Sequence, residues 1–422
     1  MINYQLKDKL LITISFFFLI YYYNLFFPVF LELETWKLWV ATFFIIIFIF
    51  FNTNECWQER FLNSIIVLGS LFILFSNNLF LLYLGLELQT FPLLILISKN
   101  RFWLKSSEAG LKYFVLGSIS SGMFLLGCSL IFLINGSLSI NNINNINFFN
   151  DNEIIGCIIL LILPLFFKVG LAPLHFWIPD IYEGSDWGTI SFLSTIPKIS
   201  VIFIIFQLGF FSDLLIFCST LSIILGVFGA LNQTKLKRLI AYSGISQIGF
   251  LSLLFYSLDN LYLELSVIYI FIYFISLISI LFILIRFNLS NNSFIIELQN
   301  KEINELENII MILLIFSLAG IPPLAGFINK WLLFVSLLNN NLFFIGIICL
   351  ILSFIGVVYY LRLIKIFAFN RNIYINSWKR ILSINKNNNL HFYFISFSIY
   401  FSIMLMVYPS SLFFLFNYYF NF

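Results

Sequence analysis

Four charged residues occur where the surrounding sequence is apolar enough to lie at lipid depth: Glu87, Lys168, Lys198 and Lys330. Glu87 lies in the middle of the run Leu81–Phe91, too far from either end for its side chain to reach the surface. An ionised group at a bilayer centre costs about 2.5–3.5 kcal/mol on insertion scales, and such groups persist where they face water or a polar interior. The four residues therefore predict a wet, charged path inside the protein, with a purely structural ion pair as the alternative.

Prolines accompany each of the three lysines. Lys168 lies between Pro164 and Pro173, Pro197 directly precedes Lys198, and Pro322–Pro323 lie upstream of Lys330. Proline removes a backbone donor and breaks the helical ladder. In lipid, such a break survives only where the freed groups face protein or a water-filled cavity. Each lysine is therefore expected beside a helix break.

This combination suits proton transfer. Desolvation lowers the pKa of a buried lysine, and a nearby carboxylate raises it again, so a Glu–Lys pair can be switched by moving one charge. Glu87 and Lys168 are the candidate pair, and Lys198 and Lys330 are further proton-transfer candidates. His175 follows Lys168 by seven residues, so two helical turns would put both on one face. An imidazole can pass protons near pH 7; the alternative is a hydrogen-bonded interface histidine.

The composition supports a membrane protein. Of 422 residues, 61% are hydrophobic and only 10% are charged, whereas soluble domains carry about 25% charged residues. The net charge of +3 is dispersed, which argues against a nucleic-acid partner. The five cysteines form no C-x-x-C pair, so we expect no metal site or disulfide. Phosphate-binding glycine motifs are absent, and the connectors are too short for a nucleotide or flavin domain.

The hydropathy pattern predicts an all-α integral membrane fold with about 13 transmembrane helices. The first run lacks a cleavage site and is expected to be a retained span rather than a signal peptide. The expected spans are 10–30, 37–51, 61–76, 79–98, 110–135, 154–172, 189–209, 212–231, 238–257, 262–286, 308–337, 342–368 and 392–416.

Two of these spans, 154–172 and 308–337, share an interruption by proline and glycine next to a lysine. Paired interrupted helices in two halves point to inverted repeats with a site near the bilayer midplane. We therefore expect one transmembrane domain over 1–422, built from antiporter-like repeats at about 61–209 and 212–368, with discontinuous helices.

Six sequence blocks between about 80 and 335 together resemble a known family. They are Glu87-Leu-Gln89, Glu108-Ala-Gly-Leu-Lys112-Tyr-Phe, Ala172-Pro173-Leu-His175-Phe-Trp177-Ile-Pro179-Asp180-Ile-Tyr182-Glu183-Gly184, Pro197-Lys198-Ile, Lys235-Leu-Lys237-Arg238-Leu-Ile-Ala-Tyr242-Ser243 and Ala319-Gly320-Ile-Pro322-Pro323-Leu-Ala-Gly326-Phe. In this order they resemble the subunit 2 family of mitochondrial NADH:ubiquinone oxidoreductase, respiratory complex I. Because Glu87 comes early in the chain, we expect the first helix of that family to be absent, and residues after 340 match only in hydropathy.

The resemblance implies an antiporter-like, proton-translocating subunit of the membrane arm, in the mitochondrial inner membrane. Glu87 and Lys168 match the family's charge pair, Lys198 its central lysine and Lys330 the lysine of its second broken helix. The partners would be other membrane-arm subunits, including further antiporter-like subunits, and membrane lipids. The chain itself would bind no cofactor, because NADH, FMN, iron–sulfur clusters and ubiquinone would be used by other subunits of this NADH:ubiquinone reductase.

Two other functions fit the same residues. One is a subunit of a multisubunit sodium/proton antiporter, which has no redox partner. The other is a structural membrane spacer that has lost transport. Co-purification with flavin and iron–sulfur subunits would separate complex I from the antiporter, and ordered water linking the four charges would argue against the spacer.

Overall fold

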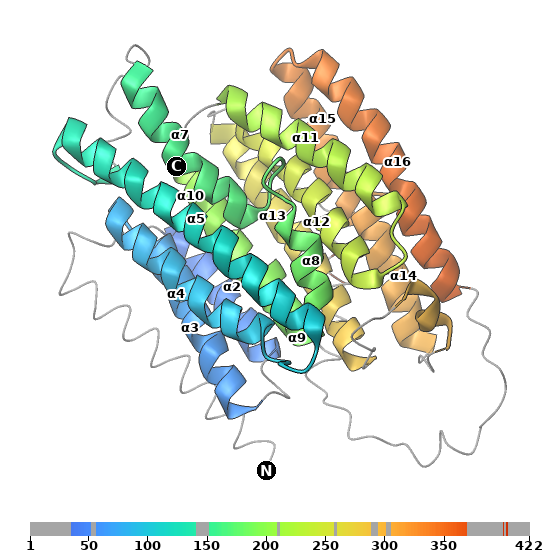
Figure 1. Cartoon of the computed structure of the whole chain (residues 1–422). Helices are drawn as coiled ribbons and strands as arrows, with labels where there is room; N and C mark the ends of the chain where they lie inside the picture. The colour runs from blue at the N-terminus through green and yellow to red at the C-terminus, as the bar shows by residue number, and fades with distance from the viewer. Residues whose placement is uncertain are drawn as a thin grey trace. The chain divides into compact units, whose positions relative to one another are not determined.

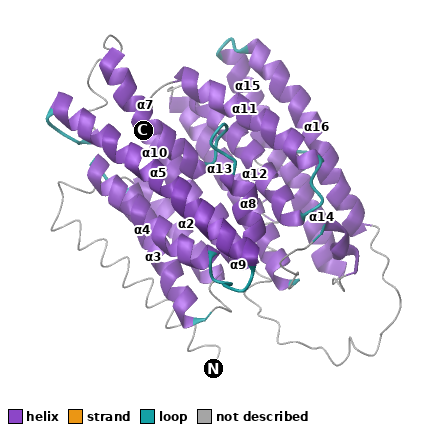
Figure 2. Ribbon diagram, viewed as in Figure 1, coloured by secondary structure: helices purple, strands orange, loops and turns teal. Residues whose placement is uncertain are grey.

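The structure is a computed structural model that describes residues 35–51, 56–140, 152–208, 212–256, 260–287, 294–300 and 305–368, together with 400, 402 and 403. Within these ranges the chain is helical, and the only β pairing is two isolated bridges, Asn78–Ser139 and Lys235–Phe294 (Figure 2). The expected all-α fold is confirmed for the part of the chain that the structure describes.

The chain forms two compact units. Unit 1 comprises Met1–Val169 and Phe192–Phe210, and unit 2 comprises Gly170–Ser191 and Phe211–Phe422. The backbone therefore passes between the units three times. The last passage, between Phe210 and Phe211, coincides with the boundary expected between the repeats 61–209 and 212–368. The relation of those repeats by inversion stays a prediction.

Unit 1 contains six helices within its described ranges. They are α2 (Thr35–Phe51), α3 (Trp57–Leu74), α4 (Leu79–Ile97), α5 (Leu104–Asn135), α7 (Asn152–Val169) and α10 (Ile196–Leu208) (Figure 1). Helices α3 and α4 approach closely through facing glycines: a Cβ on Gly69 would lie 2.9 Å from the carbonyl oxygen of Gly85. Because Gly85 is two residues before Glu87, this contact fixes the depth of the helix that carries the carboxylate.

Unit 2 contains the remaining helices. They are α8 (Trp177–Gly184), α11 (Ser212–Leu231), α12 (Leu236–Leu253), α13 (Asn260–Arg286), α14 (Glu305–Ala319), α15 (Ala325–Asn339) and α16 (Phe343–Ala368), with 3-10 turns at Leu254–Tyr256 and Ile295–Asn300. Helices α11 and α12 lie side by side, and a Cβ on Gly226 would lie 2.7 Å from the backbone nitrogen of Ser246. Glycine therefore allows two backbones to touch here. Helix α9 (Trp187–Ser194) carries the chain from unit 2 to unit 1.

The expected spans correspond to observed helices wherever the structure describes them. Seven segments are long and apolar enough to cross a membrane, and four shorter apolar helices accompany them. Three expectations need correction. The span 308–337 is two helices, α14 and α15, separated by residues 320–324. The span 189–209 is two helices, α9 and α10, that meet at Thr195, because Pro197 is tolerated at a helix start but not in its interior. The span 154–172 ends at Val169. The expected span 10–30 and most of 392–416 lie outside the described residues.

Candidate functional site

Both expected helix breaks are present, and they have the same design. Helix α7 ends at Val169, Gly170 follows with φ of 89°, the Ala172–Pro173 bond is cis, and α8 begins at Trp177. Helix α14 ends at Ala319, Gly320 follows with φ of 70°, the Pro322–Pro323 bond is cis, and α15 begins at Ala325. A positive φ is the conformation that glycine adopts at low cost. The prediction of discontinuous helices is confirmed.

Unit 1 contains both members of the predicted pair, Glu87 and Lys168. Glu87 lies near the middle of α4, in the same unit as Lys168 of α7. The Lys168 ammonium is buried and forms no hydrogen bond with any residue that the structure describes. The Glu87 carboxylate accepts a hydrogen bond from Thr90 Oγ1 at 3.2 Å. Lys168 also lies in the last turn of α7, where the helix dipole favours a positive charge.

Lys198 is in the same unit. It lies in the first turn of α10 and is 3% exposed. Helix α10 packs against α3 and α7, and Gln89 Nε2 on α4 donates to Ser200 Oγ on α10 at 3.0 Å. This hydrogen bond ties the helix of Lys198 to the helix of Glu87. Unit 1 therefore holds three of the five predicted residues.

His175 and Lys330 lie in unit 2. His175 is buried, and its ring packs against Phe176 with centroids 4.5 Å apart. The argument that two helical turns place His175 on the face of Lys168 is wrong, because α7 ends at Val169 and no continuous helix joins them.

Lys330 folds back onto the end of α14. Its Nζ donates to the carbonyl oxygen of Ala319 at 2.5 Å, at the negative end of that helix. A Cβ on Gly320 would lie 2.7 Å from both Cδ and Cε of Lys330. Gly320 is therefore required both for its backbone angle and for the space that the lysine occupies.

Sequence reasoning missed an ion cluster in unit 2, formed by Asp180 and Glu183 of α8 with Lys235 and Arg238 at the start of α12. Glu183 binds Lys235 Nζ at 2.5 Å and Arg238 Nε at 2.5 Å, and Asp180 binds Arg238 at 2.9 Å. Nearby, Lys237 Nζ donates to the Ser185 carbonyl at 2.6 Å. The acidic residues are spaced i, i+3 on α8, a signal that could have been read as one charged face. Lys37 in α2 is a further buried lysine; the hydropathy pattern places it at the start of the expected span 37–51 and gives no sign of its burial.

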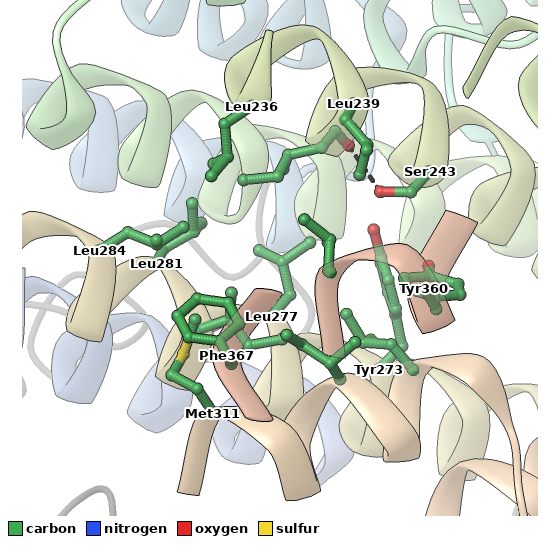
Figure 3. Close-up of a pocket in the computed structure, with 15 residues that line it drawn as sticks. Leu236, Leu239, Ser243, Tyr273, Leu277, Leu281, Leu284, Met311, Tyr360 and Phe367 are labelled. Carbon is green, nitrogen blue, oxygen red and sulfur yellow. Dashed lines mark hydrogen bonds between the residues drawn. The ribbon is translucent and has the colours of Figure 1, made fainter. Parts of the chain in front are cut away.

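Unit 2 also contains a small, mostly apolar cavity of about 40 Å³ among α12, α13, α14 and α16. The hydroxyl-bearing Ser243, Tyr273 and Tyr360 gather at one end, and Met311 and Phe367 lie at the other (Figure 3). Within the described ranges, no group of three or more His, Cys, Asp or Glu side chains is arranged to hold a metal ion.

The sequence matches a known family over residues 76–356, described as NADH:quinone oxidoreductase/Mrp antiporter, transmembrane. It is 34% identical over 317 residues to NADH-quinone oxidoreductase subunit N of Pelagibacter ubique, a match that covers 72% of this chain and 67% of that protein. It is 36% identical over 316 residues to NADH-ubiquinone oxidoreductase chain 2 of Metridium senile, covering 72% and 81%. The chain 2 of Arabidopsis thaliana is 33% identical over 361 residues, covering 82% and 71%.

Two solved structures share the fold. A chain of respiratory complex I from Thermus thermophilus has a TM-score of 0.78 at 23% identity, covering 90% of this chain and 85% of that one. A chain of the Mrp complex from Dietzia sp. has a TM-score of 0.71 at 17% identity, covering 79% and 66%.

Proposed function

This chain belongs to the NADH:quinone oxidoreductase/Mrp antiporter transmembrane family, and from that membership we propose that it is a proton-translocating membrane-arm subunit of respiratory complex I. One observation carries the proposal: the Lys168 ammonium is buried at a helix break, in the same unit as the oppositely charged Glu87 of α4. The names of the relatives support the complex I assignment, since they are subunits of NADH-quinone or NADH-ubiquinone oxidoreductase.

In unit 1, protonation and charge are linked by geometry. Glu87 and Lys168 carry opposite charges in the same unit, and the proton affinity of each group depends on the charge of nearby groups. A change of charge on either residue therefore changes the proton affinity of the other. Lys198, buried on the neighbouring α10, is the proposed next carrier.

In unit 2, Lys330 is the proposed distal site, and His175 is a proposed connector because imidazole exchanges protons near neutral pH. Lys168 precedes the first break, in the last turn of α7, whereas Lys330 follows the second break, in α15, and its ammonium binds the last carbonyl of α14. Lys330, whose ammonium binds one carbonyl at the end of α14, can release a proton with little movement of its side chain.

In this proposal the redox chemistry belongs to other subunits, and those subunits, not this chain, use NADH, FMN, iron–sulfur clusters and ubiquinone. The chain is a multi-pass membrane protein, and the proposed location is the mitochondrial inner membrane. The ubiquinone oxidoreductase chains of Metridium senile and Arabidopsis thaliana, both eukaryotes, support this location.

The test is the ratio of protons pumped to NADH oxidised in the purified complex, reconstituted into vesicles. Lys168→Met and Glu87→Gln are each expected to lower this ratio while the complex still assembles. Lys365→Met, at an exposed position in the last turn of α16, is the matched control and should keep the ratio. A wild-type ratio in both site variants would defeat the assignment, and purification without flavin and iron–sulfur subunits would favour the sodium/proton antiporter instead.

A further inference from the structure

All four terminal carbonyl groups of α14 accept hydrogen bonds. The final four carbonyls of any helix have no partner within it, and in lipid no water is available to replace one. Here Phe316 O accepts from Ile321 N at 3.3 Å and Ser317 O from Gly320 N at 3.0 Å. The next two carbonyls, of Leu318 and Ala319, are served by side chains.

These two side chains differ in charge. Gln247 Nε2 of α12 donates to Leu318 O at 3.1 Å, and the Lys330 ammonium donates to Ala319 O at 2.5 Å. The two acceptors belong to adjacent residues at the end of one helix. An ammonium carries three donors and would bind both carbonyls if the first were vacant.

Gln247 is itself held in place. Its Oε1 accepts a hydrogen bond from the Tyr269 hydroxyl of α13 at 2.8 Å, which fixes which end of the amide faces Leu318. The backbone oxygen of Tyr269 in turn accepts a longer contact of 3.5 Å from Asn329 Nδ2, the residue before Lys330. Gln247 and Tyr269 are both buried.

The start of α12 is fixed as well. The ion cluster of Asp180, Glu183, Lys235 and Arg238 joins its first turn to α8. Gln247 lies nine residues after Arg238, about 14 Å along the helix at ~1.5 Å per residue. The amide is therefore presented to Leu318 O from a helix that is anchored at one end and packed along α11.

We propose that Gln247, oriented by Tyr269, is a positioning residue for Lys330: it occupies the carbonyl of Leu318 so that the ammonium has the carbonyl of Ala319 as its single acceptor in the helix break. This inference rests on the proposed function for its effect on pumping. The structural part is independent of turnover. A neutral amide suits the task because it neither gains nor loses a proton when Lys330 does.

The first experiment measures amide hydrogen exchange in the purified complex, without substrates. Gln247→Met, which keeps the side-chain length and removes both hydrogen bonds, should speed exchange at Gly320 and Ile321 about tenfold, the effect expected for one lost buried hydrogen bond. Tyr269→Phe should act in the same direction. Gln233→Met is the control, because that amide, in the connection after α11, donates to Gly229 O of α11 and contacts no part of the helix break. Unchanged exchange at Gly320 in the Gln247→Met variant would overturn the proposal.

The second experiment separates positioning from general stability by combining variants. Gln247→Met should lower the proton-to-NADH ratio at least twofold with the rate of NADH oxidation retained. In a Lys330→Met background it should lower the ratio no further, since it acts through that lysine. An equal additional loss in that background would refute positioning. If Lys168→Met, Glu87→Gln and Lys330→Met all keep the wild-type proton-to-NADH ratio while Gln247→Met changes amide exchange as expected, the proposed function fails and the hydrogen-bond arrangement at the end of α14 stands.

Discussion

Gly320 offers a quantitative test of the second helix break. Alanine at this position would keep φ at 70° at a cost of about 1–2 kcal/mol, and its Cβ would lie 2.7 Å from Cδ and Cε of Lys330. The lysine would have to leave the carbonyl of Ala319, and a hydrogen bond to a charged group is worth about 1.5–3 kcal/mol. We expect Gly320→Ala to cost roughly 2.5–5 kcal/mol in all.

The chain provides a matched control in Gly136, the residue that ends α5. Its φ is 68°, close to that of Gly320, but a Cβ there would meet nothing within 4 Å. Gly136→Ala therefore carries the backbone cost of about 1–2 kcal/mol alone. The difference between the two variants, about 1.5–3 kcal/mol, corresponds to a roughly 10- to 100-fold loss in the population of seated Lys330.

The assay is proton pumping per NADH oxidised, in the vesicle-reconstituted complex, with thermal stability measured on the same samples. Gly136→Ala should lower stability slightly and keep the ratio. Gly320→Ala should lower both. The reasoning is refuted if Gly320→Ala keeps the wild-type ratio, or if the two variants reduce the ratio equally.

Two further variants test packing and charge in unit 2. Gly226→Ala should lower the yield of assembled complex on native gels, because its Cβ would lie 2.7 Å from the backbone nitrogen of Ser246 and overpacking costs about 1–3 kcal/mol or more. The control Gly117→Ala has open space around its Cβ and should assemble fully. Equal yields of the two variants would contradict the close packing at Gly226. Glu307→Gln should lower thermal stability by about 1–2 kcal/mol, because it breaks the 2.5 Å pair with Arg286 whose guanidinium is partly exposed; an unchanged melting temperature would show that the pair contributes nothing.

The sequence was informative where one local signal carried the answer. Long apolar runs located the helices, and proline or glycine beside Lys168 and Lys330 located both breaks. The pairing of Glu87 with Lys168 rests on their expected burial and opposite charges, and it stays a prediction.

Other features depend on partners that are distant in the sequence. Glu183 and Lys235 are 52 residues apart, and each lies at a helix end, where a charge reads as solvated. The amide of Gln247 reaches Leu318 O across 71 residues, and no periodicity reports such a contact. The prediction that Lys168 and His175 share a helical face is wrong for a local reason: α7 ends at Val169, before Gly170 with its positive φ.

The three passages of the backbone between the two units bear on how the protein is made. Unit 1 cannot be completed when Val169 leaves the ribosome, because Phe192–Phe210 also belongs to it. Residues 170–191 are synthesised before the rest of unit 2 and must wait in the bilayer for helices from Phe211 onward. Domains usually fold in order of synthesis; here unit 1 can close only after insertion of the segment up to about Phe210, and unit 2 only after the helices that follow Phe211.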